Sequence, residues 1–185
     1  SWGEVYVGGI VGSMLGNIED CSNAGNVDVL FNDTRYVGGI VGSVYSADSL
    51  KNCSNTGNVA ARVSKSSAGN AGYVGGIAGN ASIPVARCVN TGTVLGQNAK
   101  AGGVTGVASH VFLCENSGDV SSDCRAAGGI SGELFYHGDS PIIRGCLNKG
   151  SVDGAYAGGI VGEGISVLYS VNEGEVKGKC VGGIA

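Results

Sequence analysis

The stretch Val7-Gly8-Gly9-Ile10-Val11-Gly12 decides the fold, because close copies of it return along the whole chain. Each copy has the form apolar-Gly-Gly-(Ile or Val), and the copies begin at Val37, Val74, Ala101, Ala127, Ala157 and Val181. The glycine pairs follow one another at steps of 24 to 37 residues. A period of this size is typical of a solenoid, in which copies of one small unit stack on each other.

A second phrase, first seen as Cys21-Ser22-Asn23-Ala24-Gly25-Asn26-Val27, lies between successive copies of the first. Aligning the repeats gives three positions that are apolar in every copy. They are the columns Ile10, Ile40, Ile77, Val104, Ile130, Ile160 and Ile184; Val27, Val59, Val94, Val120, Val152 and Val176; and Ile18, Leu50, Val85, Val111, Ile143 and Val167. Neighbouring positions vary freely, so these columns are predicted to face the core.

One polar residue recurs as faithfully as the apolar ones, at Asn23, Asn55, Asn90, Asn116, Asn148 and Asn172. A buried amide must form hydrogen bonds or its burial costs several kcal/mol. Coils stacked about 4.8 Å apart allow each amide to bond to the next coil, which predicts a structural asparagine ladder. The doubled glycine fits either a tight bend or a close approach of coils, and the sequence leaves both open.

Helix signals are almost absent, and short apolar runs alternate with Gly and Asn. The shortest repeat leaves room for three strands of about five residues. We therefore predict an all-β chain, a parallel β-helix (β-solenoid) of about six coils, right-handed like the commoner solenoids. Residues 1–185 are expected to form a single domain and to be a fragment of a longer chain.

Composition argues against several partners. The net charge of −4 is scattered, so no nucleic-acid partner is expected. No apolar run approaches the ~20 residues that span a bilayer, so no membrane insertion is expected. Five of the seven cysteines share one repeat position, whose sixth copy is Ser170, and this predicts small buried free thiols. With no Cys-x-x-Cys pair and two His, neither a metal nor a cofactor is predicted.

Two insertions are expected to loop out of the stack, at residues 60–72 and 133–140. The second contains Glu133, Phe135, Tyr136, His137 and Asp139. Exposed aromatic and charged side chains on a loop are a binding signal, so Phe135, Tyr136, His137 and Asp139 are candidate ligand-binding residues. The simpler interpretation is a solvated loop that covers the core.

Tyr36-Val37-Gly38-Gly39-Ile40-Val41-Gly42 followed by Cys53-Ser54-Asn55-Thr56-Gly57-Asn58-Val59 resembles the GLUG-motif repeat. The resemblance extends over essentially the whole chain. It departs at Lys100, Ala126 and Cys180, which stand where other copies have Tyr, and at Ser170. The resemblance implies a bacterial, secreted or surface-anchored protein, with the repeats as a passive segment of adhesin-like proteins or beside immunoglobulin-A-specific protease domains. It implies no catalytic residues.

These observations predict a non-enzymatic, extracellular or cell-surface module that acts as a rigid stalk or display surface. Its expected partners are adjacent repeats or domains of the same chain. One alternative is an adhesin-type module that recognises host glycan or protein through loop 133–140. Another is a polysaccharide-acting β-helix enzyme, which needs paired carboxylates on one face. The acidic residues fall at different repeat positions, so no catalytic residues are predicted.

Overall fold

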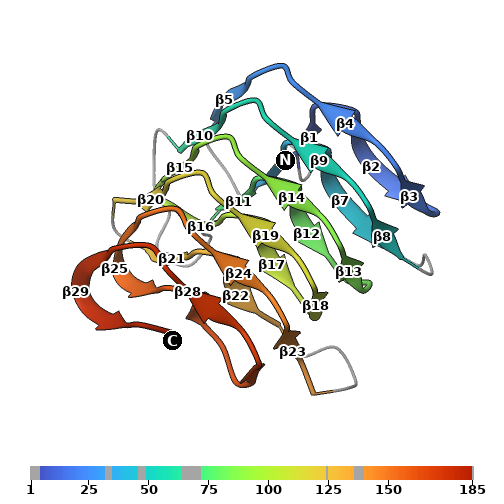
Figure 1. The fold of residues 1–185 in the computed structure, drawn as a ribbon. Helices are drawn as coiled ribbons and strands as arrows, with labels where there is room; N and C mark the ends of the chain where they lie inside the picture. Colours follow the sequence, from blue (N-terminus) through green and yellow to red (C-terminus); the bar gives the residue numbers. More distant parts are fainter. Residues whose placement is uncertain are drawn as a thin grey trace.

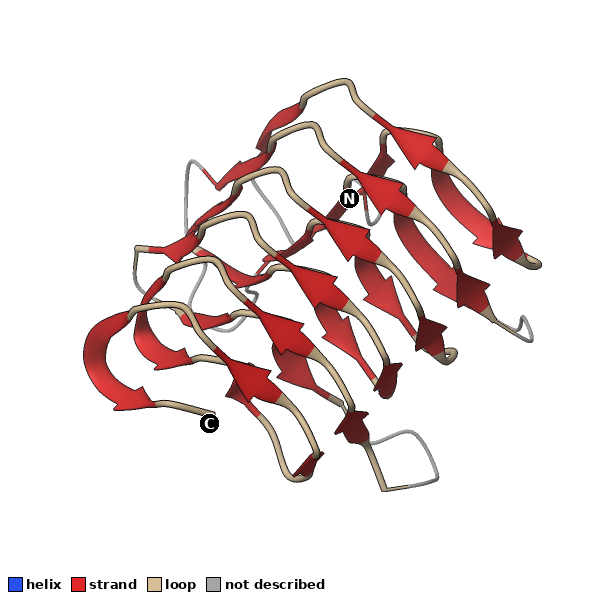
Figure 2. Cartoon of the chain, viewed as in Figure 1, coloured by secondary structure: helices blue, strands red, loops and turns tan. Residues whose placement is uncertain are grey.

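The computed structural model describes residues 5–31, 35–45, 49–63, 72–123, 125–135 and 140–184. Its regular structure within these residues is entirely β-strand (Figure 2). The strands form six coils that stack along one axis, with the first and last coils at opposite ends (Figure 1). Every strand pair is parallel, and like repeat positions lie over like, as Asn55 over Asn23 and Val59 over Val27. The chain is therefore the all-β parallel β-helix that the repeats predict.

Each coil contains five short strands rather than the three that the repeat length suggested. In the second coil these are β6 (Arg35–Gly38), β7 (Val41–Tyr45), β8 (Leu50–Lys51), β9 (Ser54–Asn55) and β10 (Val59–Val63). The prediction of three strands was wrong because the chain bends at the glycine pair and at the residue before each cysteine as well as beyond the asparagine. Short strands separated by bends let a repeat of fewer than 40 residues close around a core.

The remaining strands repeat these five positions. The first position is also held by β1 (Val5–Gly8), β11 (Gly72–Gly75), β16 (Ala99–Gly102) and β21 (Ala126–Gly128), and the second by β2 (Val11–Leu15), β12 (Ala78–Ala81), β17 (Thr105–Ala108), β22 (Ser131–Leu134) and β26 (Val161–Glu163). The third holds β3 (Ile18–Glu19), β13 (Val85–Ala86), β18 (His110–Phe112), β23 (Ile142–Arg144) and β27 (Val167–Leu168). The fourth holds β4 (Ser22–Asn23), β14 (Val89–Asn90), β19 (Glu115–Asn116), β24 (Leu147–Asn148) and β28 (Val171–Asn172). The fifth holds β5 (Val27–Phe31), β15 (Val94–Gln97) and β20 (Val120–Ser122). The longer strands β25 (Val152–Gly158) and β29 (Val176–Gly182) each run from the fifth position of one coil into the first position of the next coil.

The core has two parts. One packs the Ile column with the apolar residues of the second and third strands and the thiols, as Ile40, Val44 and Leu50 do in the second coil. The other packs the Val column against the first strand, as Val59 and Val37 do. The predicted columns are confirmed in the inner coils, where these side chains are at most 1% exposed. In the end coils Ile10 and Ile184 are 52% and 39% exposed, because no further coil covers them.

The asparagine ladder runs unbroken through all six coils. Each Nδ2 donates to Oδ1 of the next asparagine, at 2.8 Å from Asn23 to Asn55, 2.9 Å from Asn55 to Asn90, and 2.8 Å in each later step. The same Nδ2 also donates to the carbonyl oxygen of the glycine two residues later, at 2.7 Å from Asn90 to Gly92. The second bond fixes which way each amide faces, because a carbonyl oxygen accepts only from the nitrogen side. The predicted ladder is confirmed.

The ladder also explains the second glycine of each pair, while the first, such as Gly38, lies against the backbone of Val41 and of the next coil. The second glycine of each pair lies against the asparagine amide of its own coil, so that a Cβ on Gly39 would overlap Asn55 and the carbonyl of Gly76. Among the described glycines only Gly16 and Gly145 have positive φ values, so the pair is needed for close approach rather than for an unusual bend. Gly39 lies between Val37, which belongs to one part of the core, and Ile40, which belongs to the other. The contact between Gly39 and Asn55 therefore separates the two parts of the core.

A left-handed corner precedes the cysteine position in every coil, and no shared residue type marks it in the repeats. The residues with φ of 51° to 66° at this corner are Asp20, Asn52, Arg87, Leu113, Gly145 and Tyr169. Asp, Asn and Gly adopt this conformation readily, whereas Leu and Tyr adopt it at a cost. The corner turns the chain from the third strand to the fourth.

The cysteine column is buried and its thiols are free, as predicted, for Cys53, Cys88, Cys114 and Cys146; Cys21 is free and partly exposed. Each thiol donates to the carbonyl oxygen two residues earlier, at 3.3 Å from Cys114 to Phe112. Ser170 makes the same bond to Leu168 at 3.1 Å, which explains how serine replaces cysteine there. Hydrogen bonding to neighbouring thiols and burial raise the pKa of Cys53 and Cys114. Cys124 lies outside the described residues.

The predicted insertions were placed too broadly. Residues 60–63 belong to β10, and Glu133 and Leu134 belong to β22, each in register with the neighbouring coil. Residues 64–71 and 136–139 lie outside the described residues. The described part of the chain has no helix that could cross a bilayer.

Candidate ligand-binding groove

A groove lies where the first and second strands of each coil meet at the glycine pair. The strands come so close that a Cβ on Gly79 would overlap the backbone of Tyr36 and Gly42. Outward side chains of the two strands therefore face one another, and those of successive coils form two walls. Between the walls is a hollow of about 240 Å³, lined by Tyr36, Tyr45, Tyr73, Asn80, Ser82, Val107 and Phe135.

The first wall begins as a tyrosine stack. Tyr6, Tyr36 and Tyr73 are in register, with ring centroids 5.7 and 5.5 Å apart and ring planes within 9° of parallel. The register continues through Lys100, Ala126, Tyr156 and Cys180, of which all but Tyr156 depart from the repeat pattern. Because a coil spacing suits the stacking of flat rings, the tyrosines support one another and present their edges to the groove.

The second wall is polar in its middle and aromatic at its margins. Asn80 donates through Nδ2 to Oγ of Ser43 at 3.0 Å. Tyr45 and Phe135 extend from the ends of β7 and β22, and Phe135 is 53% exposed. The wall thus combines apolar ring surface with an amide and with the hydroxyl of Ser82.

A tyrosine bridge crosses the groove at its first-coil end. The hydroxyl of Tyr45 lies 3.5 Å from that of Tyr6, and their rings are perpendicular at a centroid distance of 6.4 Å. Since Tyr6 belongs to the first wall and Tyr45 to the second, the bridge ties the walls together.

Ion pairs cross the groove on the last-coil side. Nζ of Lys100 lies 2.6 Å from Oε2 of Glu163, to which it donates, and 3.0 Å from the buried Oε2 of Glu133, outside hydrogen-bond geometry. Burial of Lys100 favours a lower pKa, but its pairing with Glu163 and Glu133 outweighs this and raises the pKa. Burial, and then the nearby Glu133 carboxylate, raise the pKa of Tyr73.

The two glutamates that hold Lys100 correct an expectation drawn from the sequence. Glu133 and Glu163 occupy one repeat position and pair directly in register, although the acidic residues were expected at different positions. The sequence does not reveal this pair of glutamates, because Glu133 opens the predicted loop 133–140, whereas the structure places it in β22. Both carboxylates lie within 3.0 Å of one ammonium nitrogen.

Only part of the predicted binding loop can be placed. Phe135 lines the hollow, while Tyr136, His137 and Asp139 lie outside the described residues. His110 lies in the third strand position, with its ring centroid 6.0 Å from that of Phe112, and does not line the hollow. Tyr45, Asn80 and Lys100 lie in or beside the groove but were not among the predicted site residues. The tyrosine column was visible in the repeats, but which strand faced it was not.

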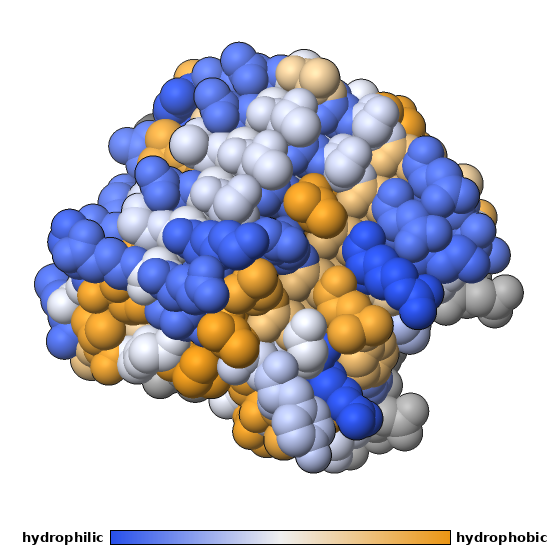
Figure 3. All heavy atoms as spheres, in the orientation of Figure 1, coloured by the Kyte–Doolittle hydropathy of each residue, from blue (hydrophilic) through white to orange (hydrophobic). Residues whose placement is uncertain are grey.

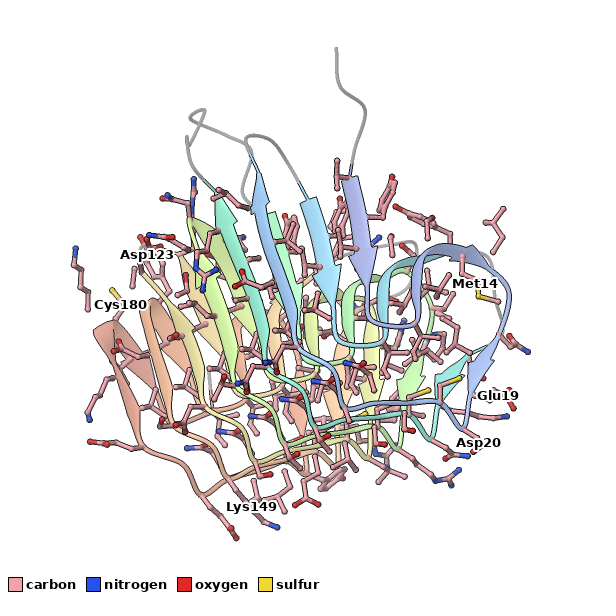
Figure 4. All side chains as sticks on the ribbon, turned by 90° about the horizontal axis from the view of Figure 1, so that it is seen from above. Met14, Glu19, Asp20, Asp123, Lys149 and Cys180 are labelled. Carbon is pink, nitrogen blue, oxygen red and sulfur yellow. The ribbon has the colours of Figure 1, made fainter. Side chains whose placement is uncertain are left out.

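The other acidic pairs join coils. Glu19 forms an ion pair with Lys51 at 2.9 Å, and Asp20 accepts a hydrogen bond from Asn52 at 3.1 Å. Both carboxylates project outward from the first coil (Figure 4). Asp119 accepts from the backbone nitrogen of Ser151 at 3.0 Å. The described residues include no group of three or more His, Cys, Asp and Glu that could hold a metal ion.

A second hollow, of about 470 Å³, lies at the left-handed corner, lined by Phe112, Leu113, Arg144, Gly145 and Tyr169. It is an open notch, formed because Gly145 has no side chain between Leu113 and Tyr169. The guanidinium of Arg144 lies 5.3 Å from the centre of the Tyr169 ring. Figure 3 shows apolar residues on this side of the molecule interrupted by charged ones.

Comparison with known proteins gives one match. A family model described as the GLUG motif matches residues 3–28 and 33–60, which contain the first two copies of both recurring phrases. No curated protein and no solved structure matches the chain.

Proposed function

Because the first two repeats match the GLUG motif and the later coils repeat them in register, we propose that the chain serves as a non-enzymatic, rigid structural module of an extracellular or cell-surface protein. It would hold other domains of the same protein apart, or display them. One observation carries this proposal: the ladders of backbone, amide and aliphatic contacts continue in register through all six coils.

The contacts between coils support rigidity. Backbone bonds such as Ile40 N to Ile77 O, at 2.9 Å, link each coil to the next. The inner asparagines of the ladder are fully buried, and shearing one coil past another would leave their amides without partners. Ion pairs between Glu19 and Lys51 and between Glu115 and Lys149 add to these links on the surface, each contributing little.

The use of the charged residues supports a non-catalytic role. Lys100 is held by two carboxylates, and Asp119 and Asp28 hold partners on the next coil. Charged groups that are engaged in holding coils together are not free to act on a substrate. The motif resemblance supports a secreted or surface-anchored setting.

Rigidity is tested by measuring the distance between the end coils. Ser22→Cys and Val171→Cys place spin labels at one repeat position in the first and sixth coils, with Cys21, Cys124 and Cys180 changed to serine. We expect a narrow distribution near five coil spacings, about 24 Å. A broad distribution would contradict the proposal.

Location is tested with an antibody against this chain on intact cells that make the whole protein. We expect binding before permeabilisation. Binding only after permeabilisation would contradict an extracellular role.

A ligand-binding module is the second candidate, and the hollow between the tyrosine stack and Phe135 favours it. Concave sites that combine aromatic rings with a few polar groups are typical of ligand binding. The two roles are compatible, because a rigid stack holds such a site in fixed geometry.

A further inference from the structure

The geometry points to a binding site for a single neutral, hydroxyl-rich ring, such as the end or branch sugar of a glycan, in the hollow between Tyr73 and Phe135. This inference rests on the ligand-binding role named as the second candidate. It concerns the walls of the groove, which the sequence did not identify.

The two cross-groove contacts limit the length of the ligand. The Tyr6–Tyr45 bridge crosses on one side, and Lys100 reaches Glu133 and Glu163 on the other. The volume of about 240 Å³ is below the range of about 300–1,000 Å³ that holds drug-sized ligands. A long chain threading along the stack would have to break these bridges, whereas one ring would not.

The lining matches both faces of a sugar ring. Tyr45 and Phe135 offer apolar ring surface to C–H groups. Asn80 uses one amide hydrogen on Ser43, which leaves its second hydrogen and its carbonyl oxygen available to hydroxyl groups. Ser82 adds a hydroxyl that both donates and accepts.

Charge selects for a neutral ligand. One lysine and two glutamates lie beside the hollow, so the cluster carries a net negative charge when all three are ionised. The Lys100 ammonium is already held by both carboxylates. A carboxylated or sulfated sugar would be repelled by them and would find no free cation among the described residues that line the hollow.

The backbone argues against an extended peptide. Peptides that bind in extended form usually add a strand to an open sheet edge. The strands of both walls around the hollow are hydrogen-bonded to the coils on either side, as β11 is to β6 and β16. No strand edge is therefore open there, and the ligand is held by side chains alone.

The test is a titration of the isotope-labelled chain, followed by NMR. The probes are methyl glycosides of glucose, galactose, mannose and N-acetylglucosamine, with glucuronic acid and sialic acid as acidic comparisons. We expect saturable shifts with at least one neutral glycoside and none with the acids. No shift with any neutral glycoside, or stronger binding of an acid, would overturn the inference.

Variants locate the site. Phe135→Ala, and Asn80→Ser, which copies the Ser43 of the preceding coil, should each weaken binding at least tenfold. Tyr156→Ala is the matched control, because Tyr156 shares the repeat position of Tyr36 and Tyr73 but lies outside the hollow. It should bind as the unchanged chain does. Binding that survives both Phe135→Ala and Asn80→Ser would overturn the inference.

Each variant's thermal unfolding shows whether it is folded, and a variant that is not is replaced by Phe135→Leu or Ser82→Ala. The spin-label distance separates this inference from the structural role. A rigid stack without sugar binding would remove the inference alone, while a flexible chain would remove the structural proposal.

Discussion

Gly76 lies so close to the side-chain amide of Asn90 that one added methyl group would overlap Asn90 Cγ and the carbonyl of Gly103. The same contact recurs in the described coils from Gly9 with Asn23 to Gly159 with Asn172. Two recurring phrases that are separate in sequence are thus one structural unit. The second glycine is needed because the asparagine ladder occupies the space where a side chain would go, and the first, such as Gly75, is needed because the backbone of Ala78 and of the next coil lies there.

The first prediction concerns this contact. Gly76→Ala should cost at least about 3 kcal/mol or prevent folding, because backbone on both sides must move. Gly183→Ala is the control: it holds the same repeat position, but nothing lies within 4 Å of its added Cβ. It should change stability by less than about 0.5 kcal/mol. Urea unfolding measures both, and equal costs would refute the account of the doubled glycine.

The second prediction concerns the ladder itself. Asn90→Ala removes an amide that is fully buried and bonded to Asn55, Asn116 and Gly92. Buried partners left unsatisfied cost about 1–3 kcal/mol each, so a loss of about 2–4 kcal/mol is expected. Asn172→Ala, in the exposed last coil, should cost clearly less. If both changes cost the same in urea unfolding, the ladder is not what stabilises the interior.

The third prediction concerns the left-handed corner. Leu113 has φ of 53° and is 57% exposed, so Leu113→Asn should stabilise the fold by up to about 1 kcal/mol. Gly145→Ala should destabilise by about 1 kcal/mol, because φ is 66° and the new Cβ would lie 2.9 Å from Leu113 Cδ2. Thermal unfolding gives the sign of each change. A destabilising Leu113→Asn would show that Leu113 contributes contacts that outweigh its backbone cost.

The fourth prediction concerns thiol protection. Cys53, Cys88, Cys114 and Cys146 are buried, whereas Cys180 is exposed at the edge of the last coil (Figure 4). A thiol-modifying reagent followed by peptide mass spectrometry should label Cys180 at once. The four buried thiols should react only as fast as the stack opens. Labelling of Cys88 as fast as Cys180 in native buffer would contradict the packed column.

The fifth prediction concerns acid stability. Hydrogen bonds from Oγ and N of Ser151 hold the pKa of Asp119 below its usual range. A carboxyl with a lowered pKa in the folded state stabilises the fold above its unfolded pKa, about 4, and this is lost as the pH falls through the folded value. The contribution at this surface site should be below about 1 kcal/mol.

Asp119→Asn tests that sign. Asn58 already accepts from the backbone nitrogen of Thr93 at the same repeat position, so asparagine should keep the bond at pH 7. The variant should lose less stability than the unchanged chain between pH 5 and pH 3. The acid dependence that remains includes Asp28, whose pKa is lowered by its hydrogen bond from Arg62. An unchanged pH profile would contradict the role of Asp119.

Repetition made much of this fold predictable. A column such as Val27 to Val176 or Asn23 to Asn172 is apolar or polar in every copy, and only an environment repeated from coil to coil produces that. The corner at Leu113 was not predictable, because side chains as different as Asp, Arg and Tyr share it and the backbone alone defines it. Variation in sequence there hides a constant conformation.

The groove was harder to predict for a different reason. Tyr73 and Asn80 come from the first and second strands of one coil and Phe135 from the end of the second strand of another, and their closeness depends on how sharply each coil folds at its glycine pair. Phe135, from the predicted binding loop 133–140, lines a hollow, and its part in ligand binding stays a prediction. The other residues that line the hollow belong to the repeats themselves, and the sequence shows the tyrosine column only as part of the repeated motif.

The asparagine amides all face the same way: from Asn23 to Asn148, one N–H of each amide donates to the carbonyl oxygen of the asparagine in the next coil. Small dipoles aligned head to tail add up, as they do along an α-helix. The interior of the stack therefore has a net dipole along its axis, which arises without any formal charge in the ladder. Its first-coil end favours positive groups and its last-coil end negative ones, so the two faces are not interchangeable as docking surfaces.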